Sequence, residues 1–512
     1  MSMPIARVST RTADMDPAAA RTRASARVRA AALAVAALAC LLVVLAALSV
    51  SAAAGAGSAR AAAHLRAPSA AARAAAVTFT ASELLGRPTA TSVTLNVVAD
   101  AAIDAYVQYG ASATRSTKHT ATVSAAAGTP LVVTVKGLKA DTRYYYRLRY
   151  RPHSSGAFSA RPQHSFMTQR AKGSTFTFTV QADPHLGDQN TNEDLYKVEM
   201  GNVLADQPDF HVDLGDTFMT EKFNAGVVDA GEDYLAHRAF FGIAGASTPI
   251  FLANGNHEGE LGWLRDGSGG SLAVRCALAR QKYYPCPVPG GFYSGSSTVE
   301  PFVGVRDGYY AWTWGDALFV VLDPFWYTAT KPGGSTDGWG WTLGQEQYRW
   351  LRSTVEGSSA RFKFVFLHHL VGGLGTEARG GIEVAGNYEW GGKNTDGSWG
   401  FDAHRPGWGK PIHQVLADAG VSVVFHGHDH IFVKQDLDGI VYQECPRPNI
   451  RKYTDNGDAA KYGYLQGVVK PNAGHLRVTV SPAKATVDYV RAYLPGDGPN
   501  RDVAYSYSLT GG

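Results

Sequence analysis

The chain has 512 residues, of which 45% are hydrophobic and 11% aromatic, so it can bury the cores of two or three domains. Its formal net charge of +4 originates in residues 1–75, which hold nine Arg, no Lys and two Asp, so the remainder is mildly acidic. An acidic body lacks the overall basic character of a nucleic-acid-binding protein, and we therefore expect no nucleic-acid partner.

Residues 1–58 have the arrangement of a secretory signal peptide. An Arg-rich segment precedes an uncharged run from Ala30 to Ala59, and small residues follow at 51–56. The uncharged run is also long enough to span a bilayer, so an uncleaved anchor is the alternative. Residues 59–76, rich in Ala, Ser and Arg, indicate a disordered linker. We expect a secreted protein, extracellular or periplasmic, with a membrane partner only if the segment stays uncleaved.

Residues 77–168 consist of short alternating segments separated by turn residues, a pattern typical of an antiparallel β-sandwich. Within them, residues 137–148 resemble the leucine-to-tyrosine corner of fibronectin type III modules. Nothing in this region supplies chemistry. We therefore expect an all-β, fibronectin III-like domain that acts as a spacer or docking module.

Residues 174–495 alternate between apolar runs and helical patterns, which predicts an α/β domain. Two long loops rich in Gly, Ser and aromatic residues, 259–307 and 372–409, are expected to form lids or rims. Residues 496–512 are predicted to be a C-terminal tail. Helices are expected at 192–207, from about 345 to 355 and at 411–419, and two strands between 475 and 493.

Five apolar, strand-like runs in this domain end abruptly in residue types that bind metals. Such a short run bounded by Gly and polar residues is typical of a buried strand, and ligands of open α/β sheets bind beyond the carboxyl ends of the strands. The sequence therefore predicts one site assembled from five distant strand ends. The runs end in Asp183-Pro-His185, Gly215-Asp216, Gly255-Asn256-His257-Glu258, His368-His369 and Gly427-His428-Asp429-His430.

These candidate ligands offer only oxygen and nitrogen, which suits Zn, Fe or Mn. One carboxylate can bridge two cations, and Asp216 is the natural bridge because its strand end lies in the middle of the set. Two cations about 4 Å apart can clamp a phosphoryl group and generate a nucleophile from water. Each motif alone can equally be a turn or a polar loop, but their order and common position favour a metal centre.

In this order the motifs resemble those of the calcineurin-like metallophosphoesterases, and with the preceding sandwich they resemble the purple acid phosphatase branch. The resemblance implies a fibronectin III-like sandwich followed by an α/β metallophosphoesterase domain, itself a β-sandwich flanked by helices. It also implies two divalent or trivalent metal ions that share Asp216. One ion would be held by Asp183, His185 and His430, and the other by Asn256, His368 and His428.

The resemblance further implies the reaction of an acid phosphatase-like hydrolase. A hydroxide between the metals attacks phosphorus, Asp216 is catalytic as the shared ligand, and His257 donates a proton to the leaving alkoxide. Glu258 is expected to orient His257. The substrate, a small phosphorylated compound, is expected to contact Asn256, His257 and His369.

Hydrolysis of phosphomonoesters is the function we expect, although the same metal pair would serve a phosphodiesterase or a nucleotide hydrolase. An extracellular binding protein with a vestigial catalytic domain is a third interpretation, which would require missing ligands, and none is missing. Tryptophans of the aromatic loops could stack a base, but packing within a lid is the favoured interpretation. They are Trp326, Trp339, Trp341, Trp390 and Trp399.

Two positions depart from the purple acid phosphatase pattern. Met219 stands where the purple enzymes have the tyrosine that gives Fe(III) its colour, and the first motif carries His185, as in non-purple members. We therefore expect a colourless centre without obligatory Fe(III). Leu370 replaces the family's Pro, which concerns the shape of the loop rather than ligation.

Cysteine is sparse. Cys40 lies in the leader, and Cys276, Cys286 and Cys445 lie beyond it. A bridge between Cys276 and Cys286 would close a small loop and suit an oxidising compartment. The sequence is compatible with this bridge and with free thiols; we carry the disulfide as a prediction, with Cys445 unpaired. The lack of a C-x-x-C pair argues against a thiolate zinc site.

Overall fold

The computed structural model describes residues 77–511 apart from 224–229, 333–337 and 376. By its contacts the chain divides into Met1–Ala74 and Ala75–Gly512, and every described residue falls in the second unit. The predicted leader and linker therefore lie outside the described residues. Among the residues that are described, no helix is both long and apolar enough to cross a membrane.

The first domain is the predicted antiparallel β-sandwich. Alternate residues of its longest strand, Tyr144, Tyr146 and Leu148, are buried in the core between its two sheets. The residues between them point to the opposite face of the sheet, because side chains alternate along a strand. One sheet has the order β1(Ala81–Gly86)-β2(Ser92–Val98)-β6(Leu131–Lys136). The other has the order β4(Lys118–His119)-β3(Ile103–Gly110)-β7(Arg143–Pro152)-β8(Ser159–Ala160), with β5(Val123–Ala125) on β3 and β9(His164–Met167) on β7.

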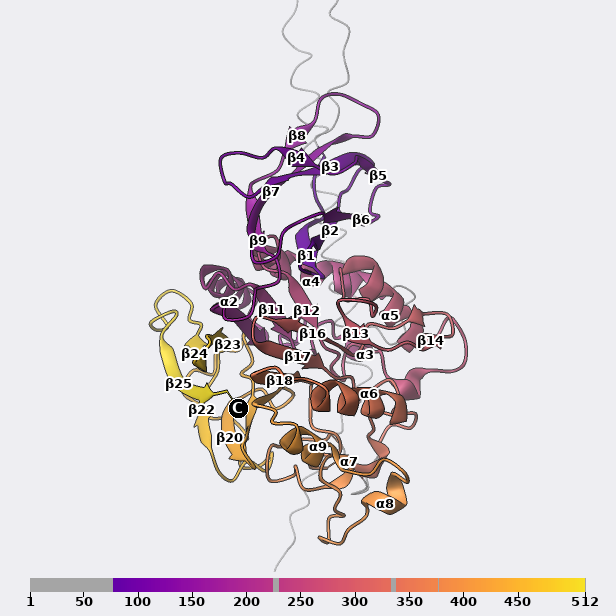
Figure 1. Ribbon diagram of the computed structural model, residues 1–512, viewed down its shortest axis with the longest axis vertical. Helices are drawn as coiled ribbons and strands as arrows, with labels where there is room; N and C mark the ends of the chain where they lie inside the picture. Colours follow the sequence, from indigo (N-terminus) through magenta and orange to yellow (C-terminus); the bar gives the residue numbers. More distant parts are fainter. Residues whose placement is uncertain (1–76, 224–229, 333–337, 376, 512) are drawn as a thin grey trace, which may run out of the picture. The chain divides into compact units, whose positions relative to one another are not determined.

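The second domain is also built on two sheets (Figure 1). Phenylalanines from both sheets, among them Phe178, Phe319 and Phe364, pack ring against ring in one core. The smaller sheet has the order β12(Ile250–Leu252)-β11(Phe210–Asp213)-β10(Phe176–Gln181)-β23(Gly474–Val480)-β24(Lys484–Arg491)-β25(Val503–Thr510). The larger has the order β13(Ser294–Gly295)-β16(Tyr310–Trp314)-β17(Ala317–Val321)-β18(Phe362–Phe366)-β19(Val423–His426)-β21(Ile440–Glu444)-β20(Phe432–Leu437)-β22(Val468–Lys470). A separate hairpin pairs β14(Val299–Glu300) with β15(Gly304–Val305).

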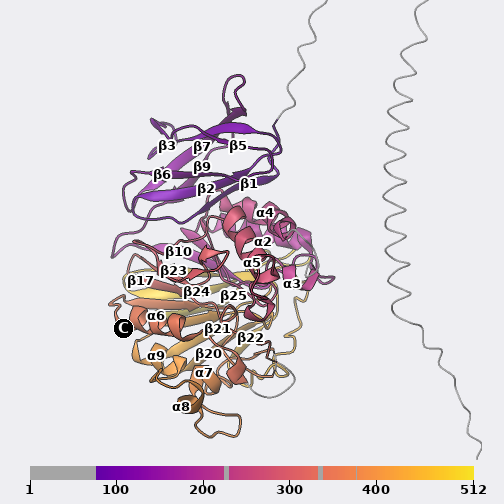
Figure 2. The ribbon, with the colours of Figure 1, turned by 90° about the vertical axis from the view of Figure 1, so that its right-hand side faces the viewer.

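Helices cover the outer faces of these sheets (Figure 2). Apolar side chains of α2(Glu193–Ala205), α4(Gly231–Gly245) and α5(Leu272–Tyr283) pack with β12 beside the smaller sheet. Those of α6(Gln345–Glu356) and α9(Ile412–Asp418) pack on β17, β18 and β19 of the larger one. This is the predicted α/β domain with a β-sandwich flanked by helices. The short helices are α3(Thr220–Phe223), α7(Tyr388–Gly391), α8(Phe401–His404), η1(Gly262–Leu264) and η2(Gly338–Gly340).

Each sheet contains a set of adjacent parallel strands. In the smaller sheet β10, β11 and β12 are parallel, with Gln181 opposite Asp213 and Asp213 opposite Leu252. In the larger sheet β18 and β19 are parallel, with Phe366 opposite Phe425. Parallel strands in register end at the same edge of a sheet, so the loops after β10, β11 and β12 begin side by side at one sheet's edge, and those after β18 and β19 begin side by side at the edge of the other.

Two details differ from the sequence predictions. The predicted tail 496–512 contains β25, which pairs along most of its length with β24, so the sheet extends beyond residue 495. Cys276 and Cys286 are both buried free thiols, and the predicted disulfide is absent from the structure. Cys276 lies within α5 and packs beside Gly259, whereas the thiol of Cys286 faces Asp307. Cys445 is also a free, buried thiol, as expected.

Four of the five loop tryptophans are packed in the interior, as the lid interpretation predicts. Trp326, Trp339, Trp341 and Trp390 are buried. Trp399 is 54% exposed and donates from its Nε1 to Asp402.

A buried histidine links the last part of the domain to α2. His475 on β23 lies 2.6 Å from the carboxylate of Glu199 and 2.9 Å from that of Asp206. Burial disfavours its charged form, but the two carboxylates raise the pKa of His475 to about 9. We predict that the ion pairs of His475 stabilise the folded protein fully below a pH of about 6.5, the pKa of an unfolded histidine. This contribution to the free energy of unfolding is lost as pH rises through 9. Chemical unfolding of the wild type between pH 6 and 10 should show this loss, and a His475→Gln variant should be less stable and lack that slope. An identical slope in the variant would contradict the assignment.

Candidate metal centre

The five loops bring together all seven side chains predicted to bind metal. Each of these residues lies within four residues of the end of a strand, and the strands belong to both sheets. Asp183 and His185 follow β10, Asp216 follows β11, Asn256 follows β12, His368 follows β18, and His428 and His430 follow β19.

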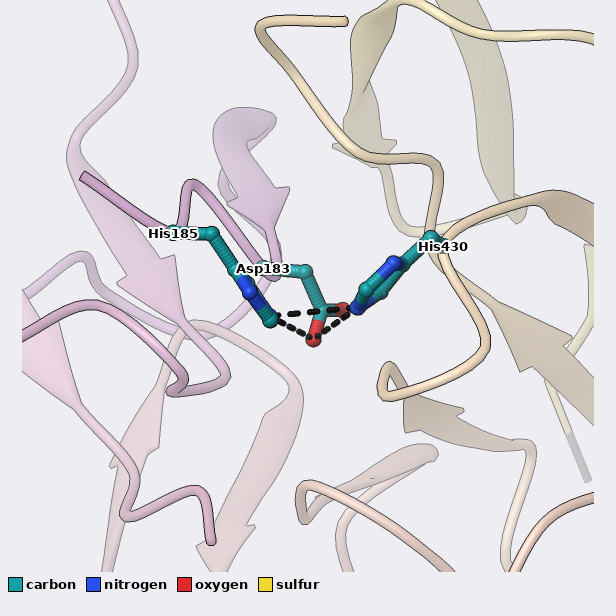
Figure 3. A group of neighbouring side chains, drawn as sticks. All are labelled: Asp183, His185 and His430. Carbon is teal, nitrogen blue, oxygen red and sulfur yellow. Dashed lines mark hydrogen bonds and ion pairs between the residues drawn. The ribbon is translucent and has the colours of Figure 1, made fainter. Parts of the chain in front are cut away.

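One group of potential ligands consists of Asp183, His185 and His430 (Figure 3). Oδ1 of Asp183 lies 3.5 Å from Nε2 of His185 and 3.5 Å from Nε2 of His430. The two imidazole nitrogens lie 3.1 Å from each other. Three ligand atoms thus converge on one point from two loops.

A second group consists of Asp216, His368 and His428. Nε2 of His368 lies 3.2 Å from Oδ2 of Asp216 and 3.1 Å from Nδ1 of His428. The amide oxygen of Asn256 lies 3.1 Å from the same Nε2. The amide of Asn256 therefore belongs to this group as a fourth potential ligand.

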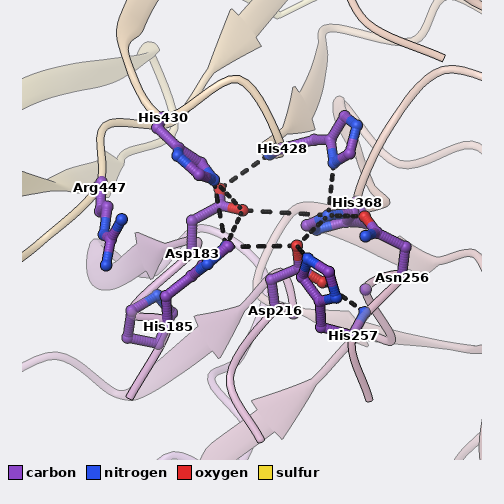
Figure 4. Close-up of polar contacts among 12 residues, drawn as sticks. Asp183, His185, Asp216, Asn256, His257, His368, His428, His430 and Arg447 are labelled. Atoms are coloured by element: carbon purple, nitrogen blue, oxygen red, sulfur yellow. Dashed lines mark hydrogen bonds and ion pairs between the residues drawn. The ribbon is translucent and has the colours of Figure 1, made fainter. Parts of the chain in front are cut away.

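Asp216 connects the two groups (Figure 4). Its Oδ2 lies 3.3 Å from Nε2 of His185 in the first group and 3.2 Å from Nε2 of His368 in the second. Its Oδ1 accepts a hydrogen bond of 2.8 Å from the backbone N–H of His257. That bond fixes the carboxylate so that one oxygen faces both groups, which is the geometry a shared ligand needs.

The chemistry of the donors fits two cations. Oδ1 of Asp183 is buried and has no hydrogen-bond partner among the described residues, although a buried carboxylate oxygen normally has one. Burial opposes a charged imidazole, yet neighbouring carboxylates raise the pKa of His185 to about 10 and that of His368 to about 9. Burial lowers the pKa of His430 to about 4 and that of His428 well below its usual value. In each group, therefore, the carboxylates favour a positive charge at the centre, and one imidazole is neutral and can bind a cation.

The backbone is strained at these positions. Five of the seven candidate ligands have a positive φ, which is uncommon for residues with a Cβ and clusters at functional sites. Two glycines allow the close approach of the loops, because a Cβ at Gly255 would overlap the carboxylate of Asp216 and one at Gly427 would overlap that of Asp183. The five are Asp183 (φ 60°), His185 (46°), Asp216 (54°), His428 (79°) and His430 (62°).

Glu258 has a different role from the one expected. Its buried carboxylate accepts backbone N–H bonds from Gly255 (2.6 Å), Asp216 (3.0 Å) and Thr217 (2.6 Å). The carboxylate therefore holds the Asp216 loop, and the orientation of His257 falls to another residue.

Glu221 is the residue that orients His257. Its carboxylate lies 3.1 Å from Nδ1 of His257, and its backbone N–H donates to the carbonyl of His257 at 3.0 Å. Nε2 of His257 is thereby left toward Asp216, at 3.9 Å from Oδ2. Burial disfavours the charged imidazole, but Asp216 and Glu221 together raise the pKa of His257. The imidazole can therefore hold a proton beside the candidate centre.

His369, which was expected to contact the substrate, is a buried residue. Its ring is buried against Trp341, 4.6 Å away, and Phe325, 5.1 Å away, and its Nδ1 bonds to the carbonyl of Leu370. It is not among the described residues that line the cavity. Burial lowers its pKa to about 3, which favours the neutral ring, and its Nε2 has no hydrogen-bond partner among the described residues.

A cavity of about 460 Å³ opens onto both groups. Basic side chains and Trp263 in its wall come from segments that carry none of the motifs, and no pattern in the sequence identified them, whereas Trp341 is one of the loop tryptophans considered for base stacking. The cavity contacts Asn256, His257 and Asp216, and its additional lining residues include Lys222, Lys331, Arg379, Trp263 and Trp341.

The sequence matches the family model of the calcineurin-like phosphoesterases over residues 176–432. The chain belongs to this family. It is a metallophosphoesterase, a hydrolase of phosphoric esters, in a family whose members use two metal ions. The two groups of ligands described above are its candidate sites for these ions. No curated protein matches the sequence.

Solved structures agree with this assignment at the level of the fold. The structure of PhoD matches with a TM-score of 0.61 at 16% identity, covering 85% of this chain and 90% of PhoD. The purple acid phosphatase PPD1 from seeds of yellow lupin (Lupinus luteus) matches with a TM-score of 0.53 at 13% identity, covering 84% of this chain and 74% of that one. The predicted calcineurin-like superfamily is thus confirmed by the family model, and the two solved structures share the fold of this chain.

Removing the Glu258 carboxylate tests its role in holding the Asp216 loop. A Glu258→Ala variant should lose several kcal/mol of stability, because each backbone N–H left unpaired in the interior costs about 1–3 kcal/mol. Chemical unfolding of the metal-free protein measures the loss. Glu221→Ala is the matched control, since that carboxylate is half-buried and should cost less than about 1 kcal/mol. Equal losses in both variants would contradict the assignment.

Proposed function

We propose that this protein is an exported, dinuclear metallophosphoesterase that hydrolyses phosphomonoesters. The observation that carries the proposal is the single carboxylate oxygen of Asp216, within 3.3 Å of an imidazole nitrogen from each of the two groups. A shared carboxylate holds two cations at the short separation that a phosphoryl group can span.

The proposed ligands are the seven residues of the two groups, with Asp216 common to both. Their oxygen and nitrogen donors suit Zn, Fe or Mn. Met219, at the position of the tyrosinate in purple enzymes, is buried and carries no group that absorbs visible light, so the proposed centre is colourless. When bound, the metal pair would polarise the phosphoryl oxygens and lower the pKa of a water molecule.

The protein's own residues supply the rest of the chemistry. The amide of Asn256 lies in the cavity wall beside the second group and can donate to a phosphoryl oxygen. His257, held by Glu221, presents Nε2 toward the cavity and donates a proton to the oxygen of the leaving group. The buried imidazole of His369 is left out of this proposal.

The cavity supports an organic phosphate as substrate. A volume of about 460 Å³ lies within the range of small-molecule pockets. Lys331 in its wall attracts an anion, whereas Lys222 is paired with Asp188 and Arg379 with Asp429. A phosphodiester or a nucleotide is the second candidate, favoured by Trp263 and Trp341 in the same wall, whose rings could contact a second ester group.

Export rests on the sequence of the leader, residues 1–58, alone. The protein would act outside the cytoplasm, as a secreted or periplasmic enzyme, or at a membrane if the apolar segment remains attached.

Changing Asp216 to Asn tests the shared ligand. The wild type should hold two metal ions per chain by elemental analysis, and Asp216→Asn should hold one or none, because an amide is a poor bridge between cations. Activity on a phosphomonoester should fall about a thousandfold or more. Asp488→Asn, a substitution of the same type on β24, should retain both metals and full activity. Two retained metals in Asp216→Asn would contradict the proposal.

A substrate panel then decides between the two candidates. Rates are measured for an aryl phosphomonoester, an aryl phosphodiester, a nucleoside monophosphate and pyrophosphate, with the metal-loaded wild type. We expect the highest kcat/KM for a monoester. A preference for the diester of tenfold or more would establish the second candidate instead.

A further inference from the structure

The charge of the protein is divided unevenly between its two domains. Residues 77–168 carry ten Lys and Arg against four Asp and Glu, whereas residues 169–512 carry 29 against 38. The acidic character of the chain beyond its leader therefore belongs to the second domain. The sandwich is strongly basic for its size, and a basic surface favours an anionic partner.

Basic side chains are concentrated on one sheet face of the sandwich. Arg143, Arg147 and Arg149 occupy alternate positions of β7 to the buried Tyr144 and Leu148, and so point away from the core. They are partly exposed. Positions two apart on a strand are separated by about 7 Å, so Arg147 and Arg149 are neighbours on this face, and Arg143 lies about 14 Å from Arg147, beyond Tyr145.

These three arginines have no carboxylate partner within 4.0 Å among the described residues. Arg143 contacts the hydroxyl of Ser165 at 3.3 Å, and Arg147 and Arg149 reach main-chain carbonyls at 3.4 and 3.5 Å. Nε of Arg149 is buried without a hydrogen-bond partner. Guanidinium groups in such long, neutral contacts keep their capacity to bind a phosphate.

The acidic group at the end of this face is already neutralised. Asp104, on the neighbouring β3, pairs with Arg151 at 3.1 Å and with His153 at 2.7 Å. It therefore leaves the row of three arginines uncompensated.

Aromatic side chains stand between the arginines. Tyr145 lies between Arg143 and Arg147 on β7, and Tyr106 on β3 is directly opposite Arg149 in the sheet. Both tyrosines are partly exposed. The arginine face, as we name it, consists of Arg143, Arg147, Arg149, Tyr106 and Tyr145, on the strands β3 and β7 that are paired in Figures 1 and 2.

We infer that the arginine face binds single-stranded nucleic acid. Arg147 and Arg149 lie at about the spacing of successive phosphates along an extended strand, Arg143 lies about two such steps from Arg147, and aromatic rings on a sheet can stack bases. A flexible acidic polypeptide could pair with the arginines, but it has no bases to stack on the tyrosines. The face lies in the sandwich, apart from the metal-binding loops, so binding is independent of the proposed hydrolysis. It would hold a phosphodiester polymer on an enzyme that cleaves phosphoric esters.

The test measures binding of a fluorescent 20-mer of oligothymidylate to the full chain by anisotropy, with a chelator present to stop metal-dependent cleavage. Affinity should fall with salt with a log–log slope of about −2, as three phosphate contacts on a single strand predict. Arg147→Glu with Arg149→Glu should weaken binding at least tenfold. The matched control, Lys136→Glu with Lys139→Glu, makes the same charge change at two exposed positions of the sandwich outside the arginine face, and should weaken it less than threefold.

A second comparison separates nucleic acid from other polyanions. Tyr145→Ala should weaken binding of oligothymidylate about fivefold and leave binding of inorganic polyphosphate unchanged, because only the former has bases. Equal losses in the two charge-reversed variants would overturn the arginine face as the site. Tighter binding of polyphosphate than of the oligonucleotide, or no effect of Tyr145→Ala, would overturn its assignment to nucleic acid. All variants should have the wild-type melting temperature and the wild-type rate of monoester hydrolysis, which verifies that they are folded. If the double glutamate variant does not fold, Arg147→Gln with Arg149→Gln replaces it.

Discussion

The structure of the catalytic domain depends on the placement of one carboxylate between two sets of imidazoles. Asp216 can be shared only if the loops of both sheets meet at one edge, so the two sheets must be packed face to face with their parallel strands in register. The phenylalanine core between the sheets fixes that packing. The position of a single oxygen atom is thus an outcome of the whole fold, and the hydrolytic chemistry of the family follows from it.

The loops that carry the ligands have strained backbone conformations, and contacts within the fold stabilise them. Left-handed backbone at Asp183, Asp216 and His428 costs free energy at each position. The backbone bonds to Glu258 and the glycine contacts of the loops restrain these conformations. A site that is strained and held in advance needs little rearrangement when cations and substrate bind.

The sequence predicts the elements that are regular and the residues whose types are distinctive. Strands such as β10 and β18 are apolar runs with polar ends, so the α/β class and the meeting of Asp216 with His368 followed from the pattern, whereas the sandwich of two sheets was predicted from the family resemblance. Glu221 could not be found in this way, because its contact with His257 depends on a one-turn helix with no motif of its own. Glu258 was placed beside His257 by adjacency in sequence, whereas the turn of the loop directs its carboxylate to the backbone of Asp216.

The predicted disulfide and the interpretation of the net charge were wrong or incomplete for the same reason. Both depend on how segments are arranged in space, which the order of residues along the chain does not reveal. Cys276 and Cys286 are close in sequence, but helix α5 and the segment after it direct their thiols to different neighbours. The net charge hid the basic sandwich, because opposite charges on two domains cancel in a sum. The predicted boundaries of the sandwich already allowed its charge to be counted separately, but which face carries the arginines is known only from the structure.

The central claim is that Asp216 is shared by two neighbouring cations. Anomalous diffraction at the absorption edge of the bound metal, from crystals of the metal-loaded protein, tests it most directly. The account predicts two anomalous peaks about 3.5–4 Å apart, both in contact with the carboxylate of Asp216. A single peak, or two peaks of which only one touches that carboxylate, would contradict it.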